Sequence, residues 1–388
     1  MLVTPTPVPK GRIDRLDATR GIAILGILLM NIFGFALPQI AYMNPSYSSA
    51  VSQSDIIVWV MFNLFAQGKF LAIFSILFGA TLALLHRKGQ RWNMCRLVIL
   101  ALLGLIHGVG FWDGDILLAY SLAGLVALLL FNQNNNTRLL QIACSIYIIG
   151  LFILFLLGSQ IDPTDFWIVS DQQALSELLQ KTSGGSVSLI YRAQSVLSMI
   201  EMLFIQYGWQ LLGLMIAGFL LLNNGWLKGQ FSQHHYRKIA ALLIVPALLI
   251  QILSLYVQSQ FGWSYFTTSI VGYIINELMI PLQSFGYIAL IYGFWGIFKH
   301  SLIAKMLKCT GRMALSNYLL QTLICTTIFY HLGYFNHFSR PELLIFIVPI
   351  WSVNLIFSYC WLRFFNQGPI EWGWRKLTEG LYGAVQKS

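Results

Sequence analysis

Apolar segments long enough to cross a membrane recur along the whole chain, and this feature most limits what the chain can fold into. The apolar layer of a bilayer needs about 20 residues of helix, and only helices or closed barrels satisfy every backbone hydrogen bond inside it. Such windows occur at 21–37, 57–85, 94–111, 116–131, 138–157, 197–222, 239–257, 267–298, 313–331 and 343–365. The sequence therefore predicts an all-α, polytopic integral membrane protein of about ten transmembrane helices.

The composition and the positions of the charges agree with this prediction. Of the 388 residues, 57% are hydrophobic and 10% are charged, which excludes an ordinary soluble domain. The net charge of +10 does not indicate nucleic-acid binding, because the basic residues gather in linkers as the positive-inside rule requires. The basic linkers 86–96, 224–238 and 299–312 alternate with linkers poor in positive charge, so we expect both termini in the cytoplasm.

The whole chain, residues 1–388, is expected to form a single transmembrane helical domain. One sizeable polar segment, 158–196, is predicted to lie outside the cytoplasm as short amphipathic helices. The lipid bilayer is the expected partner, and the oligomeric state stays open, a homodimer included.

Two apolar windows are longer than one crossing needs. The window 57–85 contains Gly68 and Lys69, and 267–298 contains Glu277 and Pro281. Each window therefore holds either a broken helix or an interfacial helix that leads into a crossing.

We expect no metal site and no disulfide framework. The cysteines lack CxxC spacing and lie in or beside apolar windows, so they are interpreted as small core residues: Cys95, Cys144, Cys309, Cys325 and Cys360. The adjacent pair His234–His235 has no third ligand at a usable spacing, and neighbouring histidines point in different directions on a helix.

Two windows pair a guanidinium at their cytoplasmic edge with a polar group deeper in the membrane. Arg20 is followed eleven positions later by Asn31, and Arg96 eleven positions later by His107. Eleven residues are about three helical turns, so each pair shares one face roughly 16 Å apart. The phosphates and the thioester of acyl-CoA are separated by a comparable length. Guanidinium suits phosphate, and histidine suits proton transfer.

Each of these residues also has a simpler interpretation. Arg20 and Arg96 could be snorkelling anchors of cytoplasmic helix ends, and His107 could be a satisfied packing residue. Asp113 and Asp115 flank a glycine and could be turn formers, and Asp115 could cap the helix that follows. A titratable group in an apolar span is nevertheless costly, which favours a functional role for His107.

Several motifs resemble one known family. They are Arg15-Leu16-Asp17-Ala18-Thr19-Arg20-Gly21, His107-Gly108, Phe111-Trp112-Asp113-Gly114-Asp115, Gln206-Tyr207-Gly208-Trp209-Gln210, Gly311-Arg312-Met313-Ala314-Leu315-Ser316-Asn317-Tyr318 with Leu319-Leu320-Gln321-Thr322, and Gly368-Pro369-Ile370-Glu371-Trp372. Over essentially the whole chain, these motifs resemble the YeiB family of bacterial inner-membrane proteins, known as domain of unknown function 418. The resemblance implies a multi-pass protein of the bacterial inner membrane and brings no established activity.

A more distant resemblance implies a reaction. The Leu16-Asp17 to Arg20-Gly21 opening is similar to acyltransferase family 3 and to the heparan glucosaminide N-acetyltransferases, as is the Gly-Arg pair followed by Ala-Leu and Tyr318. These families move acyl groups from cytoplasmic acyl-CoA to a sugar hydroxyl or amine across the membrane. Where acyltransferase family 3 has a histidine, this chain has Asn31, and where the heparan group has one, this chain has Tyr42. His107 is then the best substitute, by spacing.

We therefore expect a transmembrane acyltransferase, a membrane-bound transferase acting on an envelope component such as a sugar. Acyl-CoA, for example acetyl-CoA, would be the co-substrate, with its phosphates held by Arg20, Arg96 and Arg312. His107 would deprotonate the hydroxyl or amine of a small-molecule acceptor, and the imidazole would be oriented, or the acceptor bound, by Asp113 or Asp115. Further candidate contacts to the substrate or to the developing oxyanion are Asn31, Glu277, Asn317 and Tyr318. Direct transfer and an acyl-histidine intermediate both stay open.

Two alternatives remain. A small-solute transporter or channel is indicated by Glu277, Pro281 and the over-long windows, because discontinuous helices with ionisable groups are typical of transporters. A carboxylate at the membrane centre costs about 3 kcal/mol and needs a partner or a cavity. A catalytically silent scaffold is favoured only by the missing histidine at Asn31.

Overall fold

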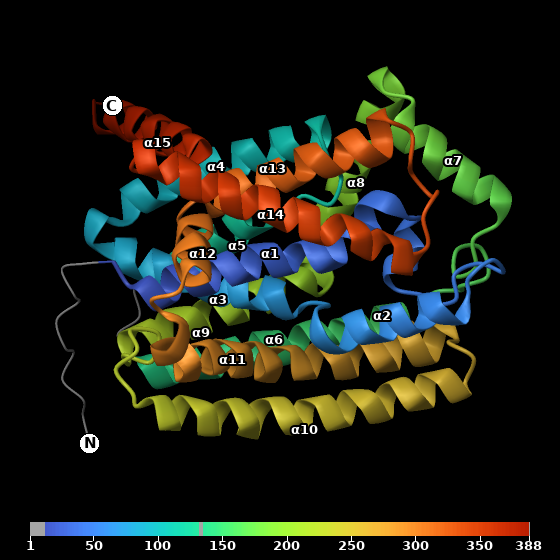
Figure 1. Ribbon diagram of the computed structural model, residues 1–388, viewed down its shortest axis with the longest axis horizontal. Coiled ribbons are helices and arrows are strands. Elements are labelled where there is room, and N and C mark those ends of the chain that lie inside the picture. Colours follow the sequence, from blue (N-terminus) through green and yellow to red (C-terminus); the bar gives the residue numbers. More distant parts are fainter. Residues whose placement is uncertain (1–11, 132–134, 388) are drawn as a thin grey trace.

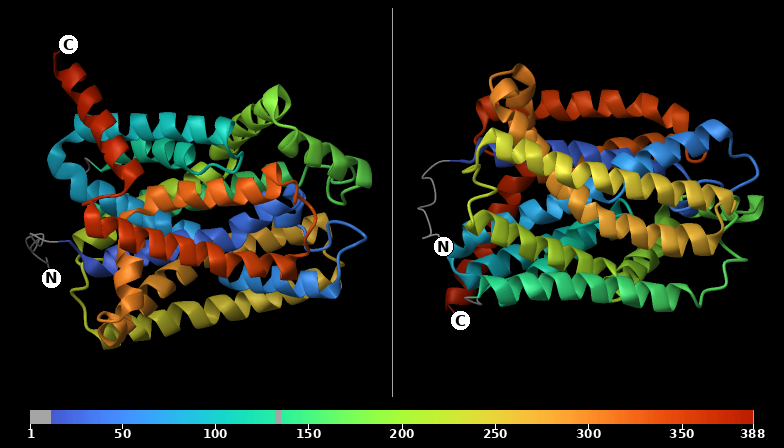
Figure 2. Two further views of the ribbon diagram at one scale, coloured as in Figure 1. Left: turned by 45° about the horizontal axis from the view of Figure 1, so that its top comes forward. Right: turned by 90° about the horizontal axis from the view of Figure 1, so that it is seen from below.

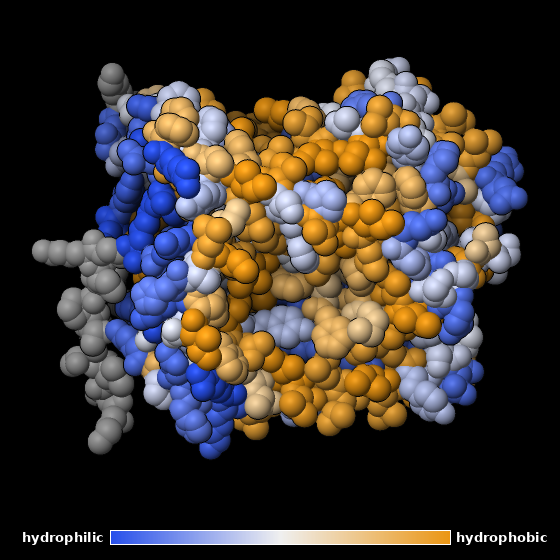
Figure 3. Space-filling model, viewed as in Figure 1, coloured by the Kyte–Doolittle hydropathy of each residue, from blue (hydrophilic) through white to orange (hydrophobic). Residues whose placement is uncertain are grey.

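The computed structural model describes residues 12–131 and 135–387, and all regular secondary structure in these ranges is helical. Large apolar side chains point outward around the bundle, among them Ile106, Phe204, Leu242 and Ile345. On the face drawn in Figure 3, an apolar belt lies between two hydrophilic ends. Lipid is the surrounding that makes such exposure favourable, so the predicted all-α membrane class is confirmed. The predicted location of the termini concerns chain ends, 1–11 and Ser388, outside the described residues.

Within the described residues, eight helical segments are long and apolar enough to cross a membrane. They are α1 (Asp14–Ala36), α2 with α3 (Gln53–Phe65 and Lys69–Leu85), α4 (Gln90–Gly110), α6 (Asn136–Gly158), α8 (Gly185–Ile205), α10 (Gln233–Gln260), η3 with α11 (Phe266–Gly272 and Tyr273–Phe298) and α14 (Arg340–Phe364). Shorter apolar helices are α5 (Leu117–Leu130), α9 (Tyr207–Asn223) and α13 (Ala314–Thr326), which continues into the π-helical η4 (Thr327–His331). The remaining helices are η1 (Gln39–Tyr42), η2 (His86–Lys88), α7 (Asp171–Thr182), α12 (Leu302–Arg312) and α15 (Pro369–Lys387).

The long helices run side by side, and the two ends of the bundle differ (Figures 1 and 2). One end, here called the basic end, holds the start of α1, the basic linkers 86–96, 224–238 and 299–312, and α15. The other end, here called the far end, holds α7. The helix α7 is short and polar, as predicted for the segment 158–196. The end of this segment differs from the prediction, because α8, which is long and apolar enough to cross a membrane, already begins at Gly185.

Glycines let two pairs of helices approach closely. A Cβ atom at Gly21 would lie 2.1 Å from a backbone oxygen of α12, and one at Gly311 would lie 1.8 Å from a backbone oxygen of α1. Gly79 of α3 and Gly218 of α9 meet their partner helices in the same way, with distances of 1.9 and 1.8 Å. Small residues allow this close backbone contact, which in lipid replaces the hydrophobic effect as a packing force.

The over-long windows differ in how they are divided. The window 57–85 is a broken helix, in which α2 and α3 are separated at residues 66–68 by Gly68 with φ of 77°. The window 267–298 is not interrupted at Pro281, because α11 continues through it; the π-helical η3 precedes α11 in this window. Proline removes the N–H that would bond the carbonyl of Glu277, and the hydroxyl of Tyr147 donates to that carbonyl at 2.7 Å instead. The window 197–222 is unexpectedly divided, at Gln206.

The core interpretation holds for only some of the cysteines. Cys95 and Cys325 are buried and Cys309 is intermediate, but Cys144 and Cys360 are exposed, so the prediction is wrong for these two. An apolar window predicts an apolar environment, and in a membrane protein that environment is either the core or the lipid.

Candidate functional site

His107 lies near the end of α4 and is held from both sides. Its Nδ1 is 2.7 Å from Oδ1 of Asp115, and its Nε2 is 3.0 Å from the hydroxyl oxygen of Thr322 on α13. All three side chains are buried. The ring of Tyr318 lies beside the imidazole, with 5.2 Å between the ring centres. The structure therefore joins the end of α4, the start of α5 and the middle of α13 around one histidine.

Local sequence explains why Asp115 reaches this histidine. Its second carboxylate oxygen accepts the N–H of Leu118 at 2.9 Å, so Asp115 both starts α5 and orients the imidazole. Two glycines of α4 bring α5 this close. A Cβ atom at Gly104 would lie 2.3 Å from the backbone nitrogen of Leu118, and one at Gly108 would lie 3.4 Å from the side chain of Asp115.

The hydrogen bonds assign the imidazole proton. A carboxylate only accepts hydrogen bonds, so Nδ1 of His107 donates to Asp115, and in the neutral imidazole Nε2 then carries the lone pair. The hydroxyl of Thr322 lies 3.0 Å from Nε2, where it can donate to that lone pair, and 3.4 Å from the carbonyl of Tyr318, which can also accept its proton. A base whose second nitrogen is held by a carboxylate is the arrangement that general-base catalysis needs. Of the two candidate aspartates, Asp115 is the one that contacts the histidine.

Asp113 has a different partner, at the far end of the bundle. Its carboxylate lies 3.6 Å from the ammonium of Lys181 on α7, and that ammonium also lies 3.4 Å from Glu177. Burial alone would lower the pKa of Lys181, but the neighbouring Asp113, Tyr330, Tyr191 and Glu177 together outweigh burial and raise that pKa well above its usual value. Asp113 therefore attaches α7 at the far-end side of the candidate site.

The three predicted phosphate-binding arginines lie at the basic end. Arg20 pairs with Asp17 at 3.2 Å and donates to Thr81 at 3.0 Å. Arg96 stacks on the ring of Trp374 from α15, 3.9 Å from its centre, and is close enough to be repelled by Arg20. Within the described chain, the buried Nη1 of Arg96 has no hydrogen-bond partner.

The guanidinium of Arg312, like that of Arg96, is only partly hydrogen-bonded within the described chain. Its Nη2 donates to the carbonyl of Asn366 at 2.9 Å, while its buried Nε finds no acceptor among the described residues. It lies within electrostatic range of Asp17, the ion-pair partner of Arg20. The basic end therefore gathers buried guanidinium N–H groups that an anion could satisfy.

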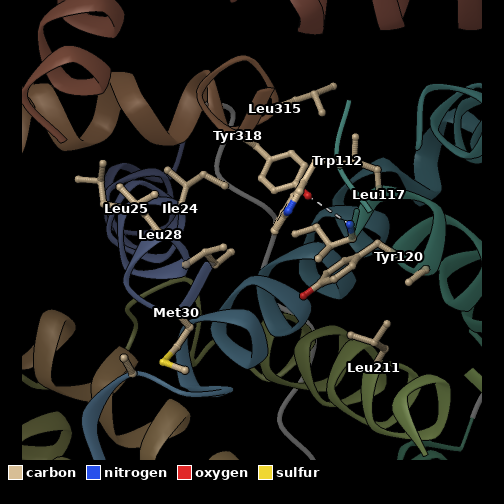
Figure 4. Packing of buried hydrophobic residues seen from close by; sticks show 14 of the residues in the cluster. Ile24, Leu25, Leu28, Met30, Trp112, Leu117, Tyr120, Leu211, Leu315 and Tyr318 are labelled. Carbon is tan, nitrogen blue, oxygen red and sulfur yellow. Dashed lines mark hydrogen bonds between the residues drawn. The ribbon is translucent and has the colours of Figure 1, made fainter. Parts of the chain in front are cut away.

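The other predicted contacts are divided between different places. Asn31 is partly buried on α1. Asn317 is fully used within its own network, donating to Met313 at 2.9 Å and to Ser358 at 2.7 Å. Tyr318 stays beside His107, and its hydroxyl accepts the N–H of Ile116 at 3.2 Å (Figure 4). The described residues offer this phenol no further hydrogen bond, so its proton is free to be donated.

Glu277 belongs to another part of the bundle. Its carboxylate accepts a hydrogen bond from Gln210, and it interacts through space with Lys69. In the described chain, neither Glu277 nor Lys69 contacts His107. Two hollows found in the described structure also lie away from the histidine: one is polar and lined by Asn63, Gln258 and Thr268, and the other is apolar and lies between α2 and α10.

Sequence reasoning missed three residues of these sites. Thr322 stood inside a quoted motif, but no spacing rule links it to His107. Trp374 lies in an amphipathic helix near the chain end, where an aromatic residue is unremarkable. Lys69 was seen only as part of a helix break, although the cost of placing a cation in an apolar window was a usable signal.

The fold and the site together define a helical integral membrane protein with a histidine–aspartate pair buried beneath one end of its bundle. Residues 221–381 match the family described as "Protein of unknown function (DUF418)". The chain is 45% identical over 377 residues to the uncharacterized protein YeiB of Escherichia coli (strain K12), covering 96% of this chain and 98% of that protein. It therefore belongs to the YeiB family, DUF418.

More distant relatives extend over the same length. The chain is 28% identical over 393 residues to the uncharacterized protein YxaH of Bacillus subtilis (strain 168), covering 95% of this chain and 94% of that protein. It is 26% identical over 378 residues to an uncharacterized 39.9 kDa protein of Bacillus acidopullulyticus, with coverage of 95% and 94%. The similarity therefore covers the candidate site and the whole bundle.

Proposed function

We propose that this protein is a transmembrane acyltransferase of the bacterial inner membrane, moving an acyl group from cytoplasmic acyl-CoA to a hydroxyl or amine of an envelope component. The observation that carries the proposal is the buried pair His107–Asp115, in which a carboxylate 2.7 Å from Nδ1 leaves Nε2 as a base. A base oriented in this way inside an apolar layer serves proton transfer better than it serves packing.

The reaction would follow from this geometry. Nε2 of His107 takes the proton of the acceptor hydroxyl while the acceptor oxygen attacks the thioester carbonyl. The developing oxyanion is stabilised by donors such as the phenol of Tyr318. Collapse of the tetrahedral intermediate breaks the carbon–sulfur bond, and the leaving thiolate takes the proton back from the imidazolium. Asp115 stabilises that imidazolium throughout.

Thr322 sets a condition on this reaction. Its hydroxyl now bonds Nε2, so an acceptor must displace it, or Thr322 must itself accept the acyl group before passing it on. Direct transfer therefore predicts an unmodified chain after incubation with acetyl-CoA alone. An acyl-enzyme predicts an acetyl group on Thr322 or His107, which mass spectrometry of peptides from α4 and α13 separates.

The basic end would hold the acyl donor. Arg96 lies eleven residues before His107 on one helix, roughly 16 Å away, which suits a thioester reaching the histidine from phosphates at the basic end. The unpartnered N–H groups of Arg96 and Arg312 support this assignment. We place the basic end in the cytoplasm, where acyl-CoA is made.

Calorimetry with purified protein in lipid nanodiscs tests the donor site. Coenzyme A should bind the wild type, and Arg96→Ala should weaken binding about tenfold or more, because a hydrogen bond to a charged group contributes about 1.5–3 kcal/mol. Arg363→Ala, which removes an outward arginine resting on Tyr359, is the matched control. Absence of binding at millimolar coenzyme A in folded protein would refute the donor site.

Transport of a small solute is the second candidate, and one observation favours it. The broken helix α2–α3 places Lys69, a fully buried cation, directly after the break. Discontinuous helices with ionisable groups at the membrane midplane are typical of transporters. If the calorimetry shows no coenzyme A site, this candidate becomes the stronger one.

A further inference from the structure

Lys69 is the first residue of α3, and its side chain lies in the interior of the bundle without any exposure to solvent. Its ammonium donates to the carbonyl of Asn63 at 2.5 Å and to Oδ1 of Asn276 at 2.7 Å. Both acceptors are neutral, so these bonds satisfy two of the three N–H groups of the lysine without neutralising its charge. A buried cation in an apolar layer is costly unless an anion accompanies it.

The nearest candidate anion has other partners. Glu277 attracts Lys69 through space, but its carboxylate is bonded by Gln210, and the two residues form no direct ion pair. The amides in the first turn of a helix lack intrahelical acceptors, and the helix dipole adds positive potential there. The start of α3 therefore offers a lysine charge and a helix terminus at the same point.

Buried polar atoms without partners surround this point. Asn276 uses its oxygen for both Lys69 and Gln251, at 2.7 Å each, which leaves its Nδ2 without an acceptor in the described chain. Oε1 of Gln251 and Oε1 of Gln283 likewise lack donors there. Each such atom costs about 1–3 kcal/mol if nothing satisfies it. Lys69, Asn276 and Gln251, which are joined by hydrogen bonds, therefore combine one free donor and one free acceptor with a cation.

A polar track leads from this cluster toward the far end. Along α10 and η3 the buried side chains Ser254, Gln258, Thr268 and Ser269 follow one another. The last three line a hollow with Asn63. This hollow has room for about one water molecule. The described state is therefore closed, and the break at Gly68 is where α2 and α3 could part.

We propose that this cluster binds a small hydroxycarboxylate that enters from the far end. The carboxylate pairs with the ammonium of Lys69, and the hydroxyl donates to Oε1 of Gln251 and accepts from Nδ2 of Asn276. One ligand thereby satisfies both the charge and the free donor and acceptor. The site lies away from His107, and it stands whether or not the acyltransferase proposal holds.

Thermal unfolding in nanodiscs tests the proposal with a matched pair of ligands. Lactate and propionate differ by one hydroxyl, and potassium chloride controls for ionic strength. In the wild type both carboxylates should raise the melting temperature, lactate more than propionate. Lys69→Met keeps the length of the side chain without its charge and should weaken the apparent affinity at least about tenfold. Lys308→Met, at the basic end, controls for the change in net charge.

A second variant keeps the test decisive if Lys69→Met folds poorly. Glu277→Gln preserves the shape of Glu277 and one acceptor oxygen for Gln210 but removes the competing negative charge, so lactate should bind more tightly than in the wild type. The proposal is overturned if chloride stabilises as well as lactate does, if propionate equals lactate, or if Glu277→Gln weakens binding.

Discussion

Replacing Asp115 by asparagine should reverse the protonation of His107 while keeping the shape of the site. The side-chain oxygen of asparagine can still accept the N–H of Leu118, now bonded at 2.9 Å. Its NH2 group then faces Nδ1 of His107, which must become the acceptor. The imidazole proton moves to Nε2 and donates to Thr322, so the lone pair no longer faces the place where an acceptor would bind.

The size of the effect follows from the contact that is lost. The bond between Asp115 and His107 is short, 2.7 Å, and both side chains are buried. A hydrogen bond to a charged group contributes about 1.5–3 kcal/mol and the neutral bond that replaces it about 0.5–1.5 kcal/mol, so the free energy of unfolding should fall by about 1–1.5 kcal/mol. Proton abstraction by a positioned base contributes about 10²–10⁴ in rate, and the variant should lose that factor in acyl transfer.

Nitrogen-15 NMR of the histidine side chains measures the tautomer without any knowledge of the substrate. The signal of His107 is the one that disappears in His107→Gln. It should report protonated Nδ1 in the wild type and protonated Nε2 in Asp115→Asn. Asp113→Asn, whose carboxylate pairs with Lys181, should leave the signal unchanged. If Asp115→Asn keeps Nδ1 protonated, our reading of the site is refuted.

Two further predictions concern how the bundle is held together. Gly311→Ala should lower the free energy of unfolding, measured by thermal unfolding, by about 3 kcal/mol or prevent folding, because its Cβ would lie 1.8 Å from a backbone oxygen. The control is Gly373→Ala on α15, whose Cβ would meet no neighbour and which should be tolerated in the same assay. Burial raises the pKa of the Glu371 carboxyl, against hydrogen bonds from Ser316 that lower it. The attachment of α15 should therefore be strongest below pH 4.5 and weaken as the pH rises through the raised pKa. The rate of hydrogen exchange in α15, divided by the rate in Glu371→Gln at the same pH, should rise with pH. A ratio that does not change with pH would contradict this prediction.

The sequence predicts the membrane class well because one physical requirement, the length of apolar helix, is written locally along the chain. Helix interruptions are predicted less well. Gly68 breaks its window, whereas Pro281 does not, because the hydroxyl of Tyr147 replaces the lost hydrogen bond. That replacement comes from a helix more than a hundred positions away, and no local pattern contains it.

The candidate site, too, can be predicted from the sequence only in part. The pairing of Arg96 with His107 on one helix follows from spacing, because both residues belong to α4. The choice of Asp115 over Asp113 depends on Lys181, and the partner of Nε2 is Thr322, on another helix. Contacts between helices decide which of several suitable side chains reaches the histidine, and a single sequence does not record them.

Transfer of labelled acetyl groups tests the central claim most directly. Purified protein in nanodiscs would be incubated with carbon-14 acetyl-CoA and envelope material from cells that lack the protein. The wild type should move label into a non-protein envelope component, and His107→Gln should lose about 10²–10⁴ of that rate. His337→Gln, which alters a histidine bonded to a loop carbonyl, should keep it. Transfer by His107→Gln at the wild-type rate, or no transfer by wild-type protein that binds acetyl-CoA, would contradict the assignment of His107 as the base.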